Sequence, residues 1–444
     1  MTRKRLCLLL IAALIIVAGA LLWMLRTPAS PFDNEANAGA AAQPELIQRG
    51  EYVARLSDCV ACHSTPENAP FSGGLAMATP VGKIYTTNIT PDRESGIGRY
   101  SLADFDRAVR QGIAQDGHRL YPAMPFPSYQ KLSDEDIRAL YAFIMHGVQP
   151  ASRKNQPSEI PWPLNMRWPL ALWRAAFASG QPWQTVANRD ALWNRGAYLV
   201  EGPGHCGSCH TPRGLAFNEK ALDARSPDYL AGALLDGWYA PSLRGDASTG
   251  ISRWSEEEVV TFLKTGRNAH AVVFGSMTDA FNNSTQFMRD DDLRAIAHYL
   301  KSLPPGSNDN GTAWHYATRS EQGARHPGEQ TFIARCSSCH GADGRGQAPW
   351  IPPLAGATSM QVDASSAINI VLNGSARVVA GGVPDAYRMP PYRKQLSDRE
   401  TAEVLNYIRS SWGNSGAQTE AKTVAEMRRH TDPASSNPII LQMR

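Results

Sequence analysis

Six of the seven cysteines in this 444-residue chain belong to three copies of the motif Cys-x-x-Cys-His. This spacing is typical of covalent haem attachment, in which both thiols bond to the porphyrin and the histidine binds the iron. The predicted attachment residues are Cys59, Cys62, Cys206, Cys209, Cys336 and Cys339, and the predicted proximal ligands are His63, His210 and His340. Three copies of the motif predict three covalently bound haem c groups.

Other chemistries of paired cysteines fit this sequence poorly. The seventh cysteine, Cys7, lies in an apolar N-terminal stretch, where we expect a small buried hydrophobe. No cysteine is therefore left over to complete a four-thiolate zinc site. A thioredoxin-like pair needs a βαβ setting, whereas the flanks of each motif predict a helix before it and a loop after it. A disulfide scaffold is implausible for so few cysteines in a chain of this length.

A methionine recurs shortly before the last helix of each repeat and is the candidate for the second axial ligand. Met124, Met277 and Met389 follow the motif histidines by 61, 67 and 49 residues. Thioether sulfur opposite histidine raises the potential of a haem. Filling gaps in the core is the commoner role of methionine, and His118 and His270 are competing ligands. Only methionine recurs at this place in all three repeats, so we predict His/Met ligation.

Two proline-containing loops are candidates for orienting the proximal histidines. Residues 241–245 and 352–356 share the form Pro-x-Leu-x-Gly. A carbonyl in such a loop can accept the proton of the proximal imidazole and fix the orientation of the ring. The first repeat has residues 87–90, Thr-Asn-Ile-Thr, in this region, and its role stays open.

The three motifs lie in repeats of a common helical plan. Apolar spacing and capping boxes predict helices over 44–56, 133–146, 289–303 and 397–411, with further helices that open at Ser101 and Ser255 and end at Gly112 and Gly266. The first helix carries Arg49-Gly50-Glu51-Tyr52, and the second repeat has Arg195-Gly196-Ala197-Tyr198 at the same place. A glycine there permits close approach of two helices or of a helix and a haem.

The expected fold class is mainly α, with three tandem class I-like cytochrome c domains after an N-terminal transmembrane or signal segment. The length agrees with about three domains. The predicted boundaries are 1–26 for the anchor or signal segment, 27–43 for a linker, 44–150 for domain 1, 151–188 for an inter-domain segment, 189–305 for domain 2, 306–322 for a linker, 323–413 for domain 3 and 414–444 for a polar C-terminal tail.

The N-terminus predicts export from the cytoplasm. Basic residues 2–5 precede an almost uninterrupted apolar run from Leu6 to Leu25, which is long enough to cross a bilayer with the body outside. A cleaved signal peptide is the alternative, with a small-residue site at 36–38. Either reading places the body at the periplasmic face of the bacterial cytoplasmic membrane. The net charge of only +3 argues against a nucleic-acid partner.

Several long strings resemble one family. Residues 84–92, 96–98, 120–125, 141–148, 160–163 and 166–170 are similar to the tri-haem cytochrome c subunit of membrane-bound bacterial dehydrogenases, which oxidise alcohols, gluconate, fructose, sorbitol or aldehydes. The resemblance covers about residues 48–412. It implies a partner dehydrogenase subunit carrying a flavin, a quinone or molybdenum, and electron flow along three haems to ubiquinone in the membrane. The family's C-terminal membrane-contacting segment has no clear counterpart in the polar residues 412–444.

Three alternatives remain open at this stage. The chain could be a free-standing membrane cytochrome that supplies a terminal oxidase, or the cytochrome subunit of a molybdenum hydroxylase. It could also be a peroxidase-like enzyme with one open haem, although a methionine in every repeat argues against that. We find no Gly-x-Gly-x-x-Gly segment opening a βαβ unit for a flavin and no hydrolase constellation, so the sequence offers no substrate-oxidising residues and no catalytic residue is assigned.

Overall fold

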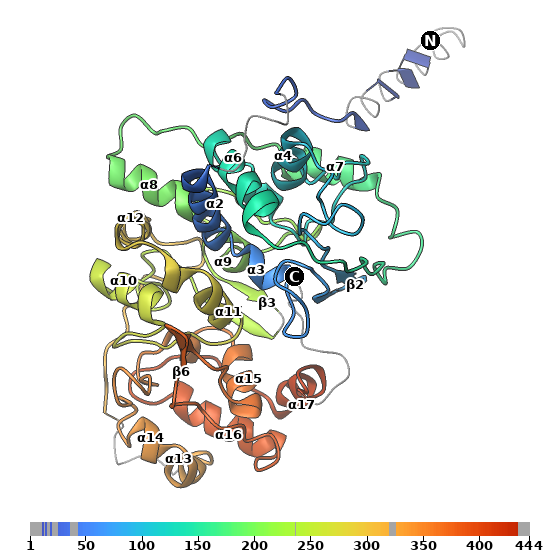
Figure 1. Ribbon diagram of the computed structural model, residues 1–444. Helices are drawn as coiled ribbons and strands as arrows, with labels where there is room; N and C mark the ends of the chain where they lie inside the picture. Colours follow the sequence, from blue (N-terminus) through green and yellow to red (C-terminus); the bar gives the residue numbers. More distant parts are fainter. Residues whose placement is uncertain are drawn as a thin grey trace, which may run out of the picture.

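The computed structural model describes residues 11–12, 14–15, 18–19, 25–35, 43–235, 237–318 and 326–433. Cys7, most of the apolar N-terminal run and the possible cleavage site at 36–38 lie outside these residues. No helix in the described part of the chain is long and apolar enough to cross a membrane. The described chain is mainly helical, as predicted (Figure 1).

The helices fall into three successive groups, which we call the first, second and third repeats. The first repeat comprises α2 (Pro44–Leu56), α3 (Cys59–Cys62), α4 (Leu102–Gln111), α5 (Phe126–Tyr129), α6 (Asp134–Ala142) and the π-helical turn η1 (Phe143–Gly147). Helix α7 (Pro169–Phe177) follows, and the second repeat comprises α8 (Ala191–Glu201), α9 (Gly207–His210), α10 (Glu256–Thr265), α11 (Ser276–Asn283), η2 (Thr285–Phe287) and α12 (Asp290–Lys301). The third comprises α13 (Glu329–Arg335), α14 (Ser337–His340), η3 (Thr358–Met360), α15 (Ser365–Asn373) and α16 (Asp398–Arg409), and α17 (Ala421–His430) ends the described chain.

Each repeat also contains a short antiparallel hairpin, which the sequence did not indicate. The pairs are β1 (Ala76–Thr79) with β2 (Gly82–Tyr85), β3 (Ala233–Leu235) with β4 (Trp238–Ala240), and β5 (Val379–Ala380) with β6 (Val383–Pro384). Strands of two to four residues are too short to show an alternating pattern. Gly82 and Gly237 turn the first two hairpins at φ values of 137° and 75°, which favour glycine.

Capping chemistry fixes the ends of the main helices as predicted. Ser101, Ser255 and Ser397 each accept a hydrogen bond from a backbone N–H three residues on, and the acidic side chain there bonds back to the serine N–H. Gly112 and Gly266 end α4 and α10 in the left-handed conformation. The sequence therefore determined these boundaries locally, before any tertiary contact is considered.

A glycine lies at the crossing of the first and last helices in every repeat. A Cβ atom on Gly50 would come 1.9 Å from the carbonyl oxygen of Ala139, and one on Gly196 would come 2.0 Å from that of Ala295. In the third repeat, Gly328 would meet the carbonyl oxygen of Glu403 at 2.0 Å. Because no side chain fits, the helix backbones touch, which explains the glycine in the repeated sequence.

The first two repeats share one continuous hydrophobic core, and the third has its own. The shared core contains Leu140 of α6 together with Leu199 of α8 and Leu293 of α12, all buried. The core of the third repeat is built around Phe332, Leu405 and neighbouring residues. In Figure 1 the third repeat, in orange and red, lies below the other two.

The polar C-terminal segment contains a helix that its composition did not indicate. Helix α17 packs on α15 and α16, and Val424 is fully buried in the third core. Arg428 donates hydrogen bonds to the backbone oxygen of Leu396 and to the Asp398 carboxylate. Val424 is the buried residue of this helix, Met427 packs partly buried against the same core, and arginine contacts complete its attachment. Its other positions are mostly polar, so composition alone did not indicate the helix.

Candidate haem sites and the interface between the first two

Each motif histidine is oriented by a backbone carbonyl. The Nδ1 atom lies 2.7 Å from the oxygen of Thr87 in His63, 2.7 Å from that of Pro241 in His210 and 3.2 Å from that of Pro352 in His340. Because a carbonyl oxygen only accepts, Nδ1 carries the proton in each ring. The two Pro-x-Leu-x-Gly loops therefore act as the sequence suggested, and Thr87 supplies the carbonyl that remained open in the first repeat.

The protonation state of these histidines suits an iron ligand. Desolvation lowers the pKa of His63, His210 and His340 below the usual range, although the carbonyl bond acts in the opposite direction. The imidazoles are therefore neutral near pH 7, with the proton on Nδ1. This leaves the Nε2 lone pair as the donor, the arrangement that a metal-bound histidine with an outer-shell carbonyl adopts.

The motif cysteines stand beside these histidines on a single short helical turn in each repeat. Desolvation raises the pKa of the Cys59, Cys62 and Cys206 thiols to about 12 and that of Cys336 to about 11. Among the described residues, no group of three or more His, Cys, Asp or Glu side chains is arranged to hold a metal ion. Two thiols next to a neutral, oriented imidazole fit covalent attachment of haem c.

The three candidate methionines are half-buried and pack against the cores. Met124 lies in the loop before α5, Met277 is the second residue of α11, and Met389 is held by a hydrogen bond from its N–H to Ser375 Oγ at 3.0 Å. The structure does not show whether these sulfur atoms bind iron, so His/Met ligation stays a prediction.

Both competing histidines are engaged by carboxylates. His118 Nδ1 lies 2.5 Å from Asp116 Oδ1. His270 Nε2 lies 3.0 Å from Glu258 Oε1, and its ring stacks on Trp254 at a centroid distance of 5.5 Å. In each ring the other nitrogen keeps its ligand position, and a carboxylate partner is compatible with metal binding, so these contacts leave His118 and His270 as competing ligands.

The first and second motifs lie close to one another. Helix α3 of the first motif contacts α11 of the second repeat. Tyr129 donates to the oxygen of Ser57 at 2.7 Å, just before the first motif, and its ring meets that of His205, just before the second, at 5.5 Å. Beside desolvation, the Cys209 thiol contributes to the raised pKa of Cys62. The first and second attachment sites are therefore neighbours, and Tyr129 contacts the residues that lead into both motifs.

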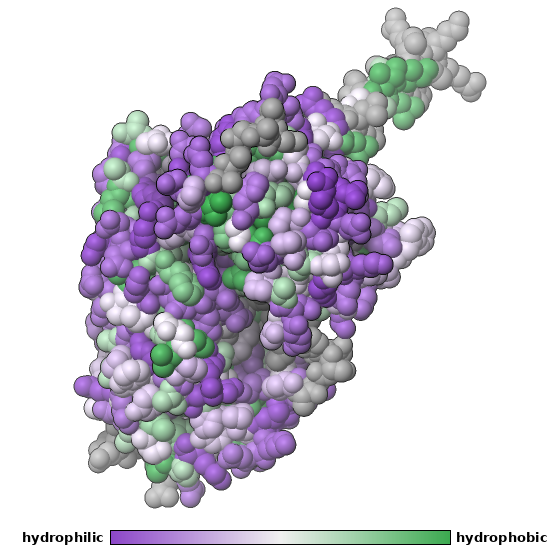
Figure 2. Space-filling model, viewed as in Figure 1, coloured by the Kyte–Doolittle hydropathy of each residue, from purple (hydrophilic) through white to green (hydrophobic). Residues whose placement is uncertain are grey.

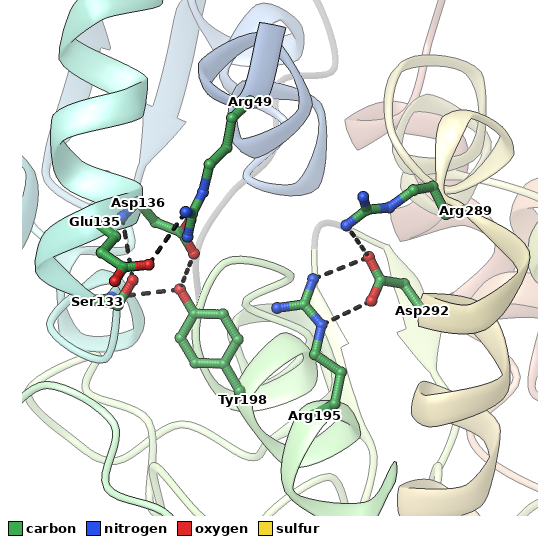
Figure 3. A network of polar contacts seen from close by, with 8 residues as sticks. All are labelled: Arg49, Ser133, Glu135, Asp136, Arg195, Tyr198, Arg289 and Asp292. Atoms are coloured by element: carbon green, nitrogen blue, oxygen red, sulfur yellow. Dashed lines mark hydrogen bonds and ion pairs between the residues drawn. The ribbon is translucent and has the colours of Figure 1, made fainter. Parts of the chain in front are cut away.

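Two crossed tyrosine–aspartate contacts join the first and second repeats. Within the first repeat, Arg49 donates to Asp136 Oδ1 at 2.8 Å, and Tyr198 of the second repeat donates to Oδ2 of the same carboxylate (Figure 3). In the second repeat, Arg195 binds Asp292 through two hydrogen bonds of 2.7 and 2.9 Å. We call the two tyrosine–aspartate contacts, Tyr198 with Asp136 and Tyr52 with Asp292, the crossed clasp.

The second half of the crossed clasp mirrors the first. Tyr52 of the first repeat donates to Asp292 Oδ2 at 2.6 Å and accepts from the backbone N–H of Arg289 at 3.0 Å. Tyr198 likewise accepts from the backbone N–H of Ser133 at 3.3 Å. Each tyrosine hydroxyl thus binds the start of the other repeat's last helix, and the two repeats form a pseudo-symmetric pair.

The third repeat cannot make this contact and is attached differently. Pro327 and Gln330 stand where the first repeat has Arg49 and Tyr52. It contacts the second repeat through an ion pair of Arg267 with Asp385 and through backbone contacts such as the Tyr239 N–H to Ser366 Oγ at 2.8 Å. The repeated Arg-Gly-x-Tyr string was the sequence signal for the clasp, but the carboxylates that its two tyrosines bind lie 62 and 240 residues away in the chain.

Three oriented histidines with paired thiols on small helical repeats define a protein of the c-type cytochrome class. A family model for cytochrome c matches residues 194–304 and 326–412, which coincide with the second and third repeats. The chain is 47% identical over 406 residues to the cytochrome c subunit of an alcohol dehydrogenase (quinone) from Gluconacetobacter polyoxogenes, covering 89% of this chain and 87% of the relative. It is 48% identical over 407 residues to the gluconate 2-dehydrogenase cytochrome c subunit of Pantoea cypripedii, covering 87% and 90%.

A fructose dehydrogenase cytochrome subunit from Gluconobacter japonicus is 36% identical over 419 residues, covering 88% of this chain and 84% of the relative. Identity at this level over most of both chains shows common descent. The chain belongs to the family of cytochrome c subunits of alcohol, gluconate and fructose dehydrogenases.

Proposed function

We propose that this chain is the electron-transfer subunit of a dehydrogenase complex at the periplasmic face of the cytoplasmic membrane. It would hold three haem c groups, accept electrons from a partner dehydrogenase subunit and pass them to ubiquinone. The observation that carries the proposal is the threefold recurrence of one donor set, a neutral histidine with Nδ1 bonded to a carbonyl next to two thiols.

The cysteines, the histidine and the methionine of each repeat would have separate roles. Covalently bound haem supplies reversible one-electron oxidation of its iron when present. Each cysteine pair would anchor the group, and the iron would be bound by the motif histidine through Nε2 and by Met124, Met277 or Met389. With both side chains bound to the iron, the three sites would carry electrons and do no substrate chemistry themselves.

The three repeats would be the three tandem class I-like cytochrome c domains that the sequence predicts. The common plan supports this: a helix before the motif, a carbonyl on the histidine, and a glycine at the crossing with the last helix. The crossed clasp makes the first two a fixed pair, which would keep their haem sites at a constant separation during turnover.

The partner and the acceptor are inferred from the relatives. Their names include alcohol, gluconate and fructose dehydrogenases, and one name specifies quinone. Because the sequence shows no flavin-binding motif and no hydrolase constellation, the partner would determine which compound is oxidised. We expect a large dehydrogenase subunit to co-purify in mild detergent, and a chain that purifies alone would contradict the partner assignment.

Single replacements of the three methionines test the electron-carrier assignment. Met124→Ala, Met277→Ala and Met389→Ala should each remove about one third of the weak sulfur–iron absorption band of the oxidised protein. Met360→Ala, which removes a buried core methionine of the third repeat, is the matched control and should leave the band unchanged. Persistence of the whole band in all three variants would show that the ligand assignment is wrong.

A further inference from the structure

The segment between the first and second repeats turns large apolar side chains toward solvent. The exposed side chains in this segment are Trp162, Leu164, Met166, Trp168, Leu172 and Phe177. Trp162 is 79% exposed and Trp168 is 51% exposed. Between residues 160 and 188 the only charged residues are two arginines, Arg167 and Arg174. The face of the molecule seen in Figure 2 is mainly hydrophilic, so such a concentration needs a reason.

One side of helix α7 packs on the body of the protein, so its other side faces solvent. The ring of Trp173 packs on that of Phe126 at 5.9 Å, and its Nε1 donates to the oxygen of Ala216 at 2.8 Å. Ala171 is fully buried. With these residues facing inward, Leu172 remains exposed on α7.

The contact with Ala216 brings a second exposed apolar loop to the same place. Leu215 is fully exposed and Phe217 is 40% exposed, and they flank the residue that Trp173 binds. Phe217 adopts a φ of 60°, in a tight turn closed by its N–H to the oxygen of Gly214 at 3.0 Å. Residues 202–218 contain no carboxylate side chain. We call the exposed residues of 162–177 together with Leu215 and Phe217 the tryptophan surface.

The predicted apolar N-terminal run joins the body beside this surface. Arg119 donates to the oxygen of Leu25 at 2.6 Å and to that of Arg26 at 3.2 Å. Arg167 in turn donates to the oxygen of Arg119 at 3.1 Å. Leu25, Arg119, Arg167 and Trp168 line one pocket. The last residue of the apolar run is therefore held against the tryptophan surface, and in Figure 1 α7 lies near the N-terminal part of the chain.

We propose that the tryptophan surface rests on the lipid bilayer, with its rings and aliphatic side chains at the headgroup level. The inference rests on the proposed location at the membrane. Exposed tryptophan and leucine with arginine, and without carboxylates, is the composition of interfacial membrane-binding segments. Leu25, at the end of the apolar run, is held beside this surface by Arg119. If that run is retained as an anchor, the bilayer lies next to the surface, and this position favours lipid over a protein partner.

Photolabelling of the complete protein in lipid nanodiscs tests the proposal. A diazirine reagent dissolved in the lipid phase should label peptides covering 160–178 and 213–218 about tenfold more than peptides with exposed apolar residues elsewhere, because the reagent is confined to lipid. The comparison sites are Ile333, Val383 and Tyr387, all exposed in the third repeat. Equal or absent labelling at the tryptophan surface would overturn the proposal.

Matched variants separate this surface from the anchor and from a partner subunit. Replacing Trp162, Trp168 and Leu215 together by serine should lower labelling of the remaining surface severalfold, whereas Ile333→Ser with Val383→Ser should not. Protection of 160–178 from aqueous footprinting in the detergent-solubilised complex, by the dehydrogenase subunit, would assign the surface to that partner and refute the lipid assignment. Haem reduction by the partner and its substrate, measured on the same samples, reports separately on the proposed function.

Discussion

Removing one hydroxyl from the crossed clasp should loosen the pairing of the first two repeats. Tyr198 is buried, and its hydroxyl donates to Asp136 and accepts from the N–H of Ser133. A hydrogen bond to a charged acceptor contributes about 1.5–3 kcal/mol. The Asp136 carboxylate keeps its Arg49 partner in Tyr198→Phe, so we expect a loss of about 2 kcal/mol, near the lower end of that range. This corresponds to an opening equilibrium about 30-fold more favourable.

The mirror variant should have a smaller effect. Tyr52 is less buried than Tyr198, and its partner Asp292 keeps two hydrogen bonds from Arg195 in Tyr52→Phe. We expect about 1 kcal/mol, an increase in opening of about fivefold. Because both tyrosines close the same interface, the double variant should differ from the sum of the single variants.

Hydrogen exchange of the haem-loaded protein measures these changes locally. Amides of α6 and α8 should exchange faster in Tyr198→Phe, and those of α15 and α16 should keep their wild-type rates. Tyr316→Phe is the control, because that hydroxyl makes one exposed contact with the oxygen of Asp343 at 3.3 Å. Wild-type exchange in α8, or an equal acceleration in the third repeat, would refute the reasoning.

Three further outcomes follow from the same structure. Gly196→Ala should destabilise the second repeat by several kcal/mol, lowering the yield of holoprotein, because its Cβ would lie 2.0 Å from the oxygen of Ala295. Burial alone would raise the pKa of Asp292, but hydrogen bonds from arginine and tyrosine lower it below its usual range. Its contribution to stability should therefore be complete above the unfolded-state pKa of about 3.9 and lost as pH falls further, and acid titration of Asp292→Asn should lack this loss. Arg267→Ala should leave the Asp385 carboxylate without its ion pair and raise protease cleavage between the second and third repeats, measured by limited proteolysis.

Local patterns in the sequence predicted the helices and the proximal side of each site. Capping boxes such as Ser255 with Glu258 and the terminating Gly266 specify helix ends within a few residues of chain. The Pro-x-Leu-x-Gly loops predicted the carbonyls of Pro241 and Pro352, because the same short string follows the motif in both repeats, although the carbonyls lie 31 residues after His210 and 12 residues after His340.

Features that depend on distant parts of the chain were not predictable in the same way. The role of Thr87, whose carbonyl accepts the hydrogen bond from His63, stayed open because its loop has no Pro-x-Leu-x-Gly pattern. The crossed clasp joins residues such as Tyr52 and Asp292, which are 240 positions apart in the chain. Repetition of the Arg-Gly-x-Tyr string did not indicate that each tyrosine would bind the aspartate of the other repeat. The tryptophan surface is assembled from two segments, and only the contact of Trp173 with Ala216 shows that they meet.

The most direct test of the central claim is the number of covalent haems on the purified chain. Intact mass spectrometry together with a haemochrome assay should give three haem c groups per polypeptide. Replacing the cysteines of one motif at a time, Cys59 with Cys62, Cys206 with Cys209 or Cys336 with Cys339, should remove one group each. A wild-type chain with fewer than three groups, or a variant that keeps all three, would contradict the account.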